Sequence, residues 1–584
     1  MAASLSMALR RALTACLSLA LWLGPPLAWA DSAPAPIKYD LSYDIFHAVE
    51  ARQGMVVSEQ AIASQVGVDI LKRGGNAVDA AVAVGFALAV VLPQAGNLAG
   101  GGFMLVHDAR TGKTVAVDFR EMAPRAAYRD MYLDSQGRVV PGRSLFTHLA
   151  SGVPGTVAGL AQTLDKYGSL KLPEVIAPAI KLARNGYIVS PELADHLAAA
   201  SERLGRWPAS RAVFFKGDKP LQAGDRLVQN DLARTLAELS RHGEQAFYKG
   251  TISRQIVAEM ARQGGLITAD DLAGYKVVER EPVHGNYRGY EVLSMPPPSS
   301  GGVHIIQMLN LLERYPLREY GSGSAQLLHL EAEAMKLAYA DRAEYLGDPD
   351  FSKVPVQGLT SRAYADELAK RIDPDHAMPS AQIKPGKPQP YESEQTTHYS
   401  VLDKDGNVVS VTYTLNLPFG SGIVVPGTGM LLNNEMDDFS AKPGVPNAFG
   451  LVGGEANAVA PLKRPLSSMS PTLVLKDGKP WLVTGSPGGS RIITTVLQTL
   501  INTIDFDMGP AGAAATPRIH HQWLPDELGV ERGVSPDTIK LLQQKGHKVV
   551  VKRAFGRTQT IQVLPEGLYG YADPRNPDGG AAGY

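Results

Sequence analysis

Two adjacent threonines, Thr396 and Thr397, stand where an irregular segment gives way to a predicted strand. Residues 379–395 contain four prolines, which excludes a regular helix or an interior strand and predicts an exposed loop. If the chain is cut before Thr396, one residue carries both a hydroxyl nucleophile and an α-amine that can serve as its base. The position therefore indicates acyl-transfer chemistry, although most threonines before strands only satisfy β propensity.

The strand that must hold Thr396 is the first half of a predicted β-hairpin. The apolar residues of the two halves alternate with polar ones, at Tyr399, Val401, Val409, Val411 and Tyr413. Between them, residues 403–407 read DKDGN, and the glycine suits a tight reversal. Thr396 is thus expected at the tip of a strand, beside an accessible loop.

Three other motifs contain residues that could do chemistry, but each lacks the context it needs. The glycines at residues 100–102 have no strand-GxGxxG-helix frame, so a tight turn is favoured over a dinucleotide site. His520 and His521 are adjacent, and neighbouring side chains diverge instead of sharing a metal. Ser299 and Ser300 have neither a GxSxG nor an SxxK frame, which favours a pocket wall or a turn.

Length and charge restrict the classes of partner. A chain of 584 residues suggests two intertwined or consecutive units. The 57 basic residues are balanced by 58 acidic ones, so no net field favours nucleic acid or an anionic membrane. Small molecules are the expected partners.

The N-terminus has the pattern of an export signal. Arg10 and Arg11 precede an apolar run over residues 12–23, and Ala28-Trp29-Ala30 forms a small-x-small cleavage site. The run is too short for a stable membrane anchor. We expect a signal peptide over residues 1–30, cleavage after Ala30, and a periplasmic or secreted protein.

Cysteine usage agrees with this expectation. Cys16 is the only cysteine and follows the arginines by only a few residues, so a lipid anchor there is disfavoured. The mature chain would contain no thiol and no disulfide, which excludes thiol chemistry and leaves stability to the core.

Periodicity predicts a mixture of helices and strands. The helices are expected over residues 58–72, over residues 77–91 with Asn76 as the cap, through most of residues 157–263, and along an amphipathic stretch from Leu328 to Leu346. Strands are expected over residues 103–106, 114–119, 472–475 and 481–484. Strands on both sides of helical blocks favour an α+β or layered α/β/α arrangement.

The stretch TTHYSVLDKDGN, which begins at Thr396, resembles the start of the small subunit of γ-glutamyltransferases of the bacterial type. Further motifs of that family follow in order: YTLN at 413–416, LLNNEMDDF at 431–439, KRPLSSMSPT at 463–472 and TGSPGGSRI at 484–492. NAVDAAVA, GGGFM, DFREMAP and MPPPSSGG match upstream, and ADPR matches near the end. The resemblance covers essentially the whole mature chain.

The resemblance implies a four-layer αββα fold of the N-terminal nucleophile hydrolase type. It also implies that one precursor cuts itself between Gln395 and Thr396, giving a large subunit over residues 31–395 and a small subunit over residues 396–584 that form a heterodimer. The enzyme would transfer the γ-glutamyl group of glutathione or another γ-glutamyl donor to water, an amino acid or a peptide. No metal or other cofactor is implied.

Roles for individual residues also come from the resemblance. Thr396 would form the γ-glutamyl ester and Thr414 would orient it. Gly488 and Gly489 would offer backbone N–H groups to the oxyanion. The donor's carboxylate would be bound by Arg120, Ser467 and Ser468, and its ammonium by Asn416, Glu435 and Asp438. Taken alone, Arg120 could equally form a surface salt bridge, and the two serines a loop turn.

Two positions vary within the family pattern. Glu435 stands where many bacterial members have Gln and animal members have Glu, so its charge is expected to influence donor preference and pH profile. Residues 443–455 resemble the lid loop of bacterial members, with Phe449 in place of the usual Tyr. Phenylalanine keeps the packing but loses a hydroxyl hydrogen bond, which predicts weaker lid closure.

Two competing interpretations remain open from the sequence. Related amidases such as cephalosporin or glutaryl acylases share the nucleophile and the self-cleavage but accept other acyl groups. An exported peptide-binding protein without chemistry is the alternative from another class.

Overall fold

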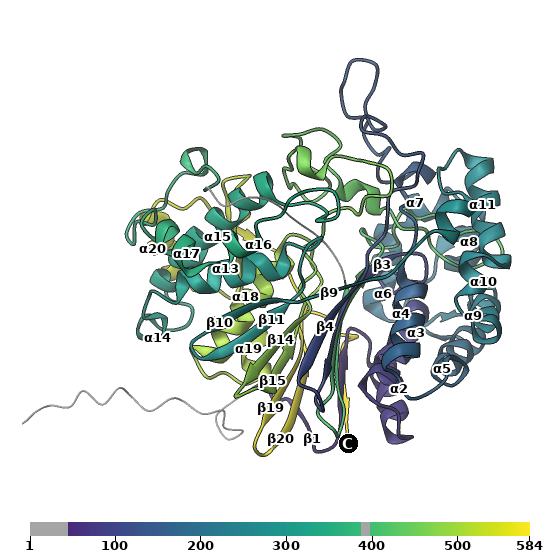
Figure 1. Cartoon of the computed structure of the whole chain (residues 1–584), viewed down its shortest axis with the longest axis horizontal. Helices are drawn as coiled ribbons and strands as arrows, with labels where there is room; N and C mark the ends of the chain where they lie inside the picture. Colours follow the sequence, from purple (N-terminus) through teal and green to yellow (C-terminus); the bar gives the residue numbers. More distant parts are fainter. Residues whose placement is uncertain (1–44, 387–396) are drawn as a thin grey trace, which may run out of the picture. The chain divides into compact units, whose positions relative to one another are not determined.

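Two seven-stranded antiparallel sheets lie at the centre of the computed structural model (Figure 1). The structure describes residues 45–386 and 397–584, which belong to one unit spanning residues 39–584. The predicted signal segment, Cys16, Gln395 and Thr396 lie outside the described residues.

Each sheet combines strands from distant parts of the chain. The first has the order β1 (Val49–Ala51), β20 (Gly567–Ala572), β19 (Gln559–Leu564), β15 (Lys479–Thr484), β14 (Thr472–Lys476), β11 (Tyr290–Ser294) and β10 (Val283–Tyr287). The second has the order β21 (Gly580–Gly583), β2 (Met55–Ser58), β12 (Thr397–Leu402), β13 (Val408–Thr414), β3 (Gly101–Asp108), β4 (Lys113–Phe119) and β9 (Val278–Arg280).

The two sheets face each other across an apolar layer. In β3, Phe103 and Leu105 point into this layer, whereas Met104 and Val106 point to the opposite face and join the helical core. Because β3 is buried on both faces, its sequence does not alternate between apolar and polar residues.

Helices cover the outer face of the second sheet (Figure 1). They are α2 (Ala61–Lys72), α3 (Ala77–Val91), α4 (Thr156–Tyr167), α5 (Leu172–Asn185), α6 (Pro191–Ala199), α7 (Ser201–Gly205), α8 (Pro208–Phe214), α9 (Asn230–His242), α10 (Gln245–Tyr248), α11 (Thr251–Gln263) and α12 (Ala269–Ala273). The predicted cap of α3 is confirmed: Asn76 and Asp79 form a reciprocal capping box.

A second helical layer covers the first sheet (Figure 1). Its members are α13 (Gly301–Leu312), α14 (Leu317–Tyr320), α15 (Ala325–Tyr345), α16 (Val356–Leu359), α17 (Arg362–Ala369), α18 (Arg491–Ile504), α19 (Pro510–Ala515) and α20 (Pro536–Gln544). The expected amphipathic character of α15 is wrong, because nearly all of its residues are buried between neighbouring elements.

Short elements complete the fold. They are the strands β5 (Tyr187–Ile188), β6 (Phe215–Lys216), β7 (Lys219–Pro220), β8 (Arg226–Leu227), β16 (Ile519–His520), β17 (Leu528–Glu531) and β18 (Val549–Lys552), and the 3-10 helices η1 (His148–Ala150), η2 (Ser380–Gln382), η3 (Glu435–Asp438) and η4 (Glu455–Asn457).

The predicted hairpin is confirmed as β12 and β13, with Thr397 paired to Tyr413 and Gly406 in a left-handed turn conformation. The tight turn expected at residues 100–102 is wrong, because Gly101 and Gly102 are strand residues of β3. Glycine is needed there for close approach: a Cβ on Gly100 would lie 1.9 Å from the carbonyl oxygen of Thr414.

Candidate active site

Arg120 is fully buried at the end of β4, so the surface salt bridge considered for it is wrong. Its guanidinium forms ion pairs with Glu435, through Nη1, and with Asp438, at 2.6 Å from Nη2. Nε also donates to the carbonyl oxygen of Pro465 at 3.1 Å, and Nη2 to that of Leu466 at 2.9 Å. One arginine thus joins β4, η3 and the loop that follows residue 463.

A third carboxylate, Glu121, lies beside this group and was not predicted. Its Oε2 is 3.7 Å from Arg120 Nη1, and the side chain is fully buried. Burial raises the pKa of Glu121 to about 7 and that of Glu435 well above its usual range, although Arg120 opposes both shifts. One guanidinium faces three buried carboxylates, and this excess of buried negative charge favours the protonated forms of Glu121 and Glu435. The only feature of the sequence that could have pointed to Glu121 is its position directly after Arg120 in the motif DFREMAP.

Ser467 and Ser468 lie in a buried loop that is hydrogen-bonded to residues 298–300, the segment before α13. Ser467 N donates to Pro298 O at 2.9 Å, and Ser467 O accepts from Ser300 N at 2.8 Å. Ser299 Oγ donates to Met469 O at 2.7 Å, so this buried hydroxyl helps to hold the loop. Ser468 Oγ is buried and has no hydrogen-bond partner among the described residues, so it can bond a ligand.

Thr414 and Asn416 connect the end of β13 to η3. Thr414 Oγ1 accepts the backbone N–H of Asn416 at 2.7 Å, which leaves its own proton to donate. Asn416 has a φ of 76°, a left-handed conformation, and its Nδ2 donates to Asn434 O at 2.8 Å. Within the described part of the chain, its buried Oδ1 lacks a hydrogen-bond partner. These bonds bring Asn416 next to Glu435.

Gly488 and Gly489 lie in the loop between β15 and the N-terminus of α18. Their φ values are 133° and 66°, which favour glycine, and Gly488 is exposed. At the start of this loop, a Cβ on Gly485 would lie 2.4 Å from the ring of His398, so the loop packs directly on β12. The burial that lowers the pKa of His398 to about 3 keeps that ring neutral.

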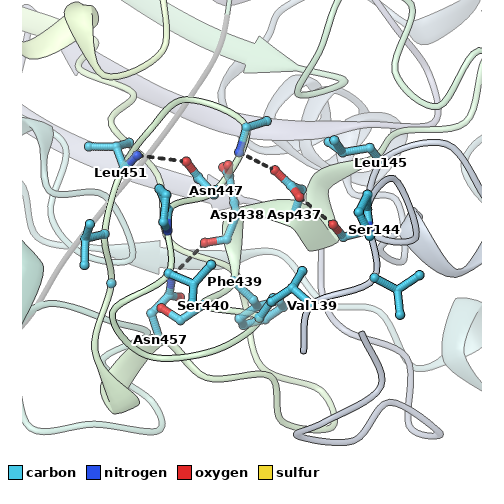
Figure 2. A pocket seen from close by; sticks show the side chains of 18 of the residues that line it. Val139, Ser144, Leu145, Asp437, Asp438, Phe439, Ser440, Asn447, Leu451 and Asn457 are labelled. Atoms are coloured by element: carbon cyan, nitrogen blue, oxygen red, sulfur yellow. Dashed lines mark hydrogen bonds between the residues drawn. The ribbon is translucent and has the colours of Figure 1, made fainter. Parts of the chain in front are cut away.

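A pocket of about 280 Å³ lies next to Asp438, between the loop containing Ser144 and the predicted lid loop (Figure 2). Asp437 joins its two walls: it accepts from Ser144 Oγ at 2.6 Å and from Ala448 N at 3.1 Å. Phe449 is half-buried against the helical core that contains α13 and α18, and its carbonyl oxygen accepts from Gln522 Nε2 at 3.2 Å.

One group of side chains elsewhere has the composition of a metal site: His329, Glu333 and His547, all buried. However, His329 Nδ1 lies 2.8 Å from His547 Nε2, which is hydrogen-bond distance. Two nitrogens that share a tetrahedral zinc ion lie about 3.3 Å apart, given Zn–N bonds of about 2.0–2.1 Å. Lys336 Nζ also bonds Glu333 at 2.7 Å. The geometry fits a hydrogen-bonded network better than a bound cation.

Residues 63–584 match the family model described as Gamma-glutamyltranspeptidase. The chain belongs to the gamma-glutamyltranspeptidase family. Within this family it is 61% identical over 568 residues to the glutathione hydrolase proenzyme of Escherichia coli (strain K12), covering 97% of this chain and 98% of that protein. It is 50% identical over 548 residues to the glutathione hydrolase proenzyme of Pseudomonas sp. (strain A14), covering 92% of this chain and 95% of that protein.

The fold of this gamma-glutamyltranspeptidase family member also matches a crystal structure of cephalosporin acylase from Bacillus halodurans. The TM-score is 0.83 at 31% identity, covering 96% of this chain and 99% of that one. The match supports an acylase-type mixed α/β fold with two large antiparallel sheets. In the described part of the chain, no helix combines the length and apolar character needed to cross a membrane.

Proposed function

We propose that this family member is a self-cleaving γ-glutamyltransferase and glutathione hydrolase that acts through an ester on Thr396. The observation that carries the proposal is a continuous set of bonds from the hairpin to the buried arginine. Thr414 bonds Asn416, Asn416 bonds the residue before Glu435, and Glu435 pairs with Arg120. The residues expected to bind both charges of a glutamyl donor therefore lie beside the strand that follows Thr396.

The finer fold assignment is part of the proposal. We assign the chain to the four-layer αββα sandwich of N-terminal nucleophile hydrolases, with a large subunit over residues 31–395 and a small subunit over residues 396–584. Supporting this, an apolar layer separates the two sheets and a helical layer covers each outer face. Residues 1–30 would direct export to the periplasm or the exterior.

Maturation and turnover use the same hydroxyl in this scheme. Thr396 Oγ attacks the carbonyl of Gln395, and an ester replaces the peptide bond, which frees the α-amine of Thr396. Water then hydrolyses the ester, releasing the Gln395 carboxylate and restoring the Thr396 hydroxyl. That amine then accepts the proton when Thr396 Oγ attacks the γ-glutamyl carbonyl, and the amine of the leaving group takes it up. Water or an amino acid, the second substrate, cleaves the γ-glutamyl ester.

Backbone donors near β15 support the charged intermediate. Gly488 and Gly489 would direct N–H groups to the oxyanion, and their left-handed conformations favour glycine at both positions. Removing one such donor costs about 3–4 kcal/mol of barrier in related chemistry. The Thr414 proton would orient the attacking oxygen.

Arg120 is already engaged by two carboxylates, so the donor's carboxylate must replace one of these bonds or bind through Ser468 Oγ. The donor's ammonium would restore charge balance among Glu435, Asp438 and Glu121. A zwitterionic end group suits this site better than the lone carboxylate of a glutaryl donor, which would add uncompensated negative charge to an acidic cluster. This distinction favours a glutamyl donor over a glutaryl one.

A denaturing gel and an activity assay test the proposal together. The wild-type chain should give fragments of roughly 40 and 20 kDa, from an average residue mass of about 110 Da, and Thr396→Ala should remain whole. The processed protein should release the aniline from a γ-glutamyl anilide and should not cleave the glutaryl analogue. Turnover of the glutaryl compound alone would favour an acylase, and an uncut, inactive chain would favour a binding protein.

A further inference from the structure

Glu59 is a buried carboxylate next to the first residue of β12, and it lies outside the group around Arg120. Its Oε1 accepts the hydroxyl of Thr397 at 2.6 Å, and its side chain is 4% exposed. Glu59 follows β2, which pairs with β12 through Ser58 and Tyr399. The carboxylate therefore holds the first residue of the strand by its side chain.

The same carboxylate is linked to the glycine loop through Arg557. Arg557 Nη1 lies 3.8 Å from Glu59 Oε2, and the backbone N–H of Arg557 donates to Ser486 Oγ at 2.8 Å. Asn576 Nδ2 fixes the backbone of Glu59 by donating to its carbonyl oxygen at 2.9 Å. Glu59 thus has a fixed backbone and a neighbouring cation, as a positioning side chain requires.

Cleavage before Thr396 would turn this end of β12 into a chain terminus. Terminal residues are poorly ordered unless side chains or backbone bonds hold them. A displacement of about 1 Å at a reacting group can cost about a hundredfold in rate. The hydroxyl of Thr397, one residue from the terminus, is the first side chain of the strand that the structure shows anchored.

We propose that Glu59 is a positioning residue: through Thr397 Oγ1 it holds the strand end that carries the nucleophile. This inference rests on the proposed function. Because Glu59 acts on the nucleophile and not on the donor's binding groups, its loss should lower kcat and leave KM nearly unchanged.

The test uses the full-length chain with the variants Glu59→Ala, Thr397→Val and Thr397→Ser, and the double variant of the first two. We expect Glu59→Ala and Thr397→Val each to lower kcat for a γ-glutamyl anilide about 10- to 100-fold, with KM within about twofold. The double variant should be no slower than the slower single variant, because both remove one interaction. Thr397→Ser retains the hydroxyl and should keep most of the wild-type kcat.

A matched control exists at α12, where Thr268 Oγ1 donates to the buried carboxylate of Asp271 at 2.7 Å. Thr268→Val removes the same kind of bond and should lower the melting temperature without changing kcat. Wild-type kcat in Thr397→Val, or losses that multiply in the double variant, would overturn the inference. If Glu59→Ala does not fold, the kcat of Thr397→Val is compared with that of Thr397→Ser. Equal kcat values in these two variants would overturn the inference. A wild-type protein without γ-glutamyl turnover would instead refute the proposed function.

Discussion

At the scale of single residues, the candidate site depends on how one buried guanidinium is shared among carboxylates. Burial by itself would lower the pKa of Arg120, but Glu435, Asp438 and Glu121 together raise it, so the arginine stays charged. Arg120 is therefore expected both to bind substrate and to stabilise the buried carboxylates around it.

Replacing Arg120 by methionine should show this structural role. The change leaves buried carboxylates without their cation, and breaking such a pair costs about 3–5 kcal/mol. We expect a lower melting temperature as well as loss of γ-glutamyl turnover, measured by differential scanning fluorimetry and the anilide assay. Arg120→Lys keeps the charge and should recover much of the stability but little activity, because it loses the forked geometry. An unchanged melting temperature in Arg120→Met would contradict this account.

Glu121 predicts a pH dependence with a definite sign. Its pKa of about 7 in the folded protein lies above the ordinary value of 4.5, so the fold favours the protonated form. Its contribution to stability is present below pH 4.5 and is lost as the pH rises through 7. Glu121→Gln removes this loss. Urea unfolding of uncut Thr396→Ala protein at pH 5 and 7.5 should therefore show the Gln variant gaining stability relative to its parent as the pH rises.

At the scale of elements, the start of β3 must allow Thr414 to approach closely. In Gly100→Ala the added Cβ would meet Thr414 O, and overpacking of this kind costs about 1–3 kcal/mol or displaces the strand. We expect reduced kcat and a lower melting temperature. Gly112→Ala is the control: φ is +69° there and nothing lies within 4 Å of the new Cβ, so only about 1–2 kcal/mol of strain is added and kcat should persist.

Asp437 bonds the predicted lid loop to the loop that contains Ser144 (Figure 2). Asp437→Ala releases both Ser144 and Ala448. Because a hydrogen bond to a charged group contributes about 1.5–3 kcal/mol, we expect at least a tenfold rise in KM for the donor. Chymotrypsin should also cut the released loop faster after the half-buried Phe449. Asp134→Ala, which removes an exposed pair with Arg138, should change neither measurement.

At the scale of the whole molecule, the strand order predicts how the two fragments behave after cleavage. In the second sheet, β12 and β13 lie between β2 and β3, so strands of the proposed small subunit are enclosed by strands of the large one. The fragments should co-elute in size-exclusion chromatography even at 1 M NaCl, since apolar burial resists salt. Separation by salt alone would contradict this arrangement.

The sequence predicted features that local patterns determine. The hairpin followed from alternation around DKDGN, and the cap of α3 from one asparagine before a run of small apolar residues. The full burial of α15 could not be predicted, because it depends on neighbours distant in the chain. Motif resemblance found Arg120 and Glu435 but not their pairing. Glu59 and Glu121 were missed because nothing in their local sequence shows that they are buried.

The strand order also has a consequence for timing. In the first sheet β1 pairs with β20, and in the second β2 lies between β12 and β21. A ribosome makes the chain from the N-terminus, so neither sheet can close until residues beyond 566 have been synthesised. An emerging chain would therefore lack both complete sheets for most of its synthesis. If the chain is exported and cuts itself as proposed, this order of strands would delay the cleavage until translocation could take place.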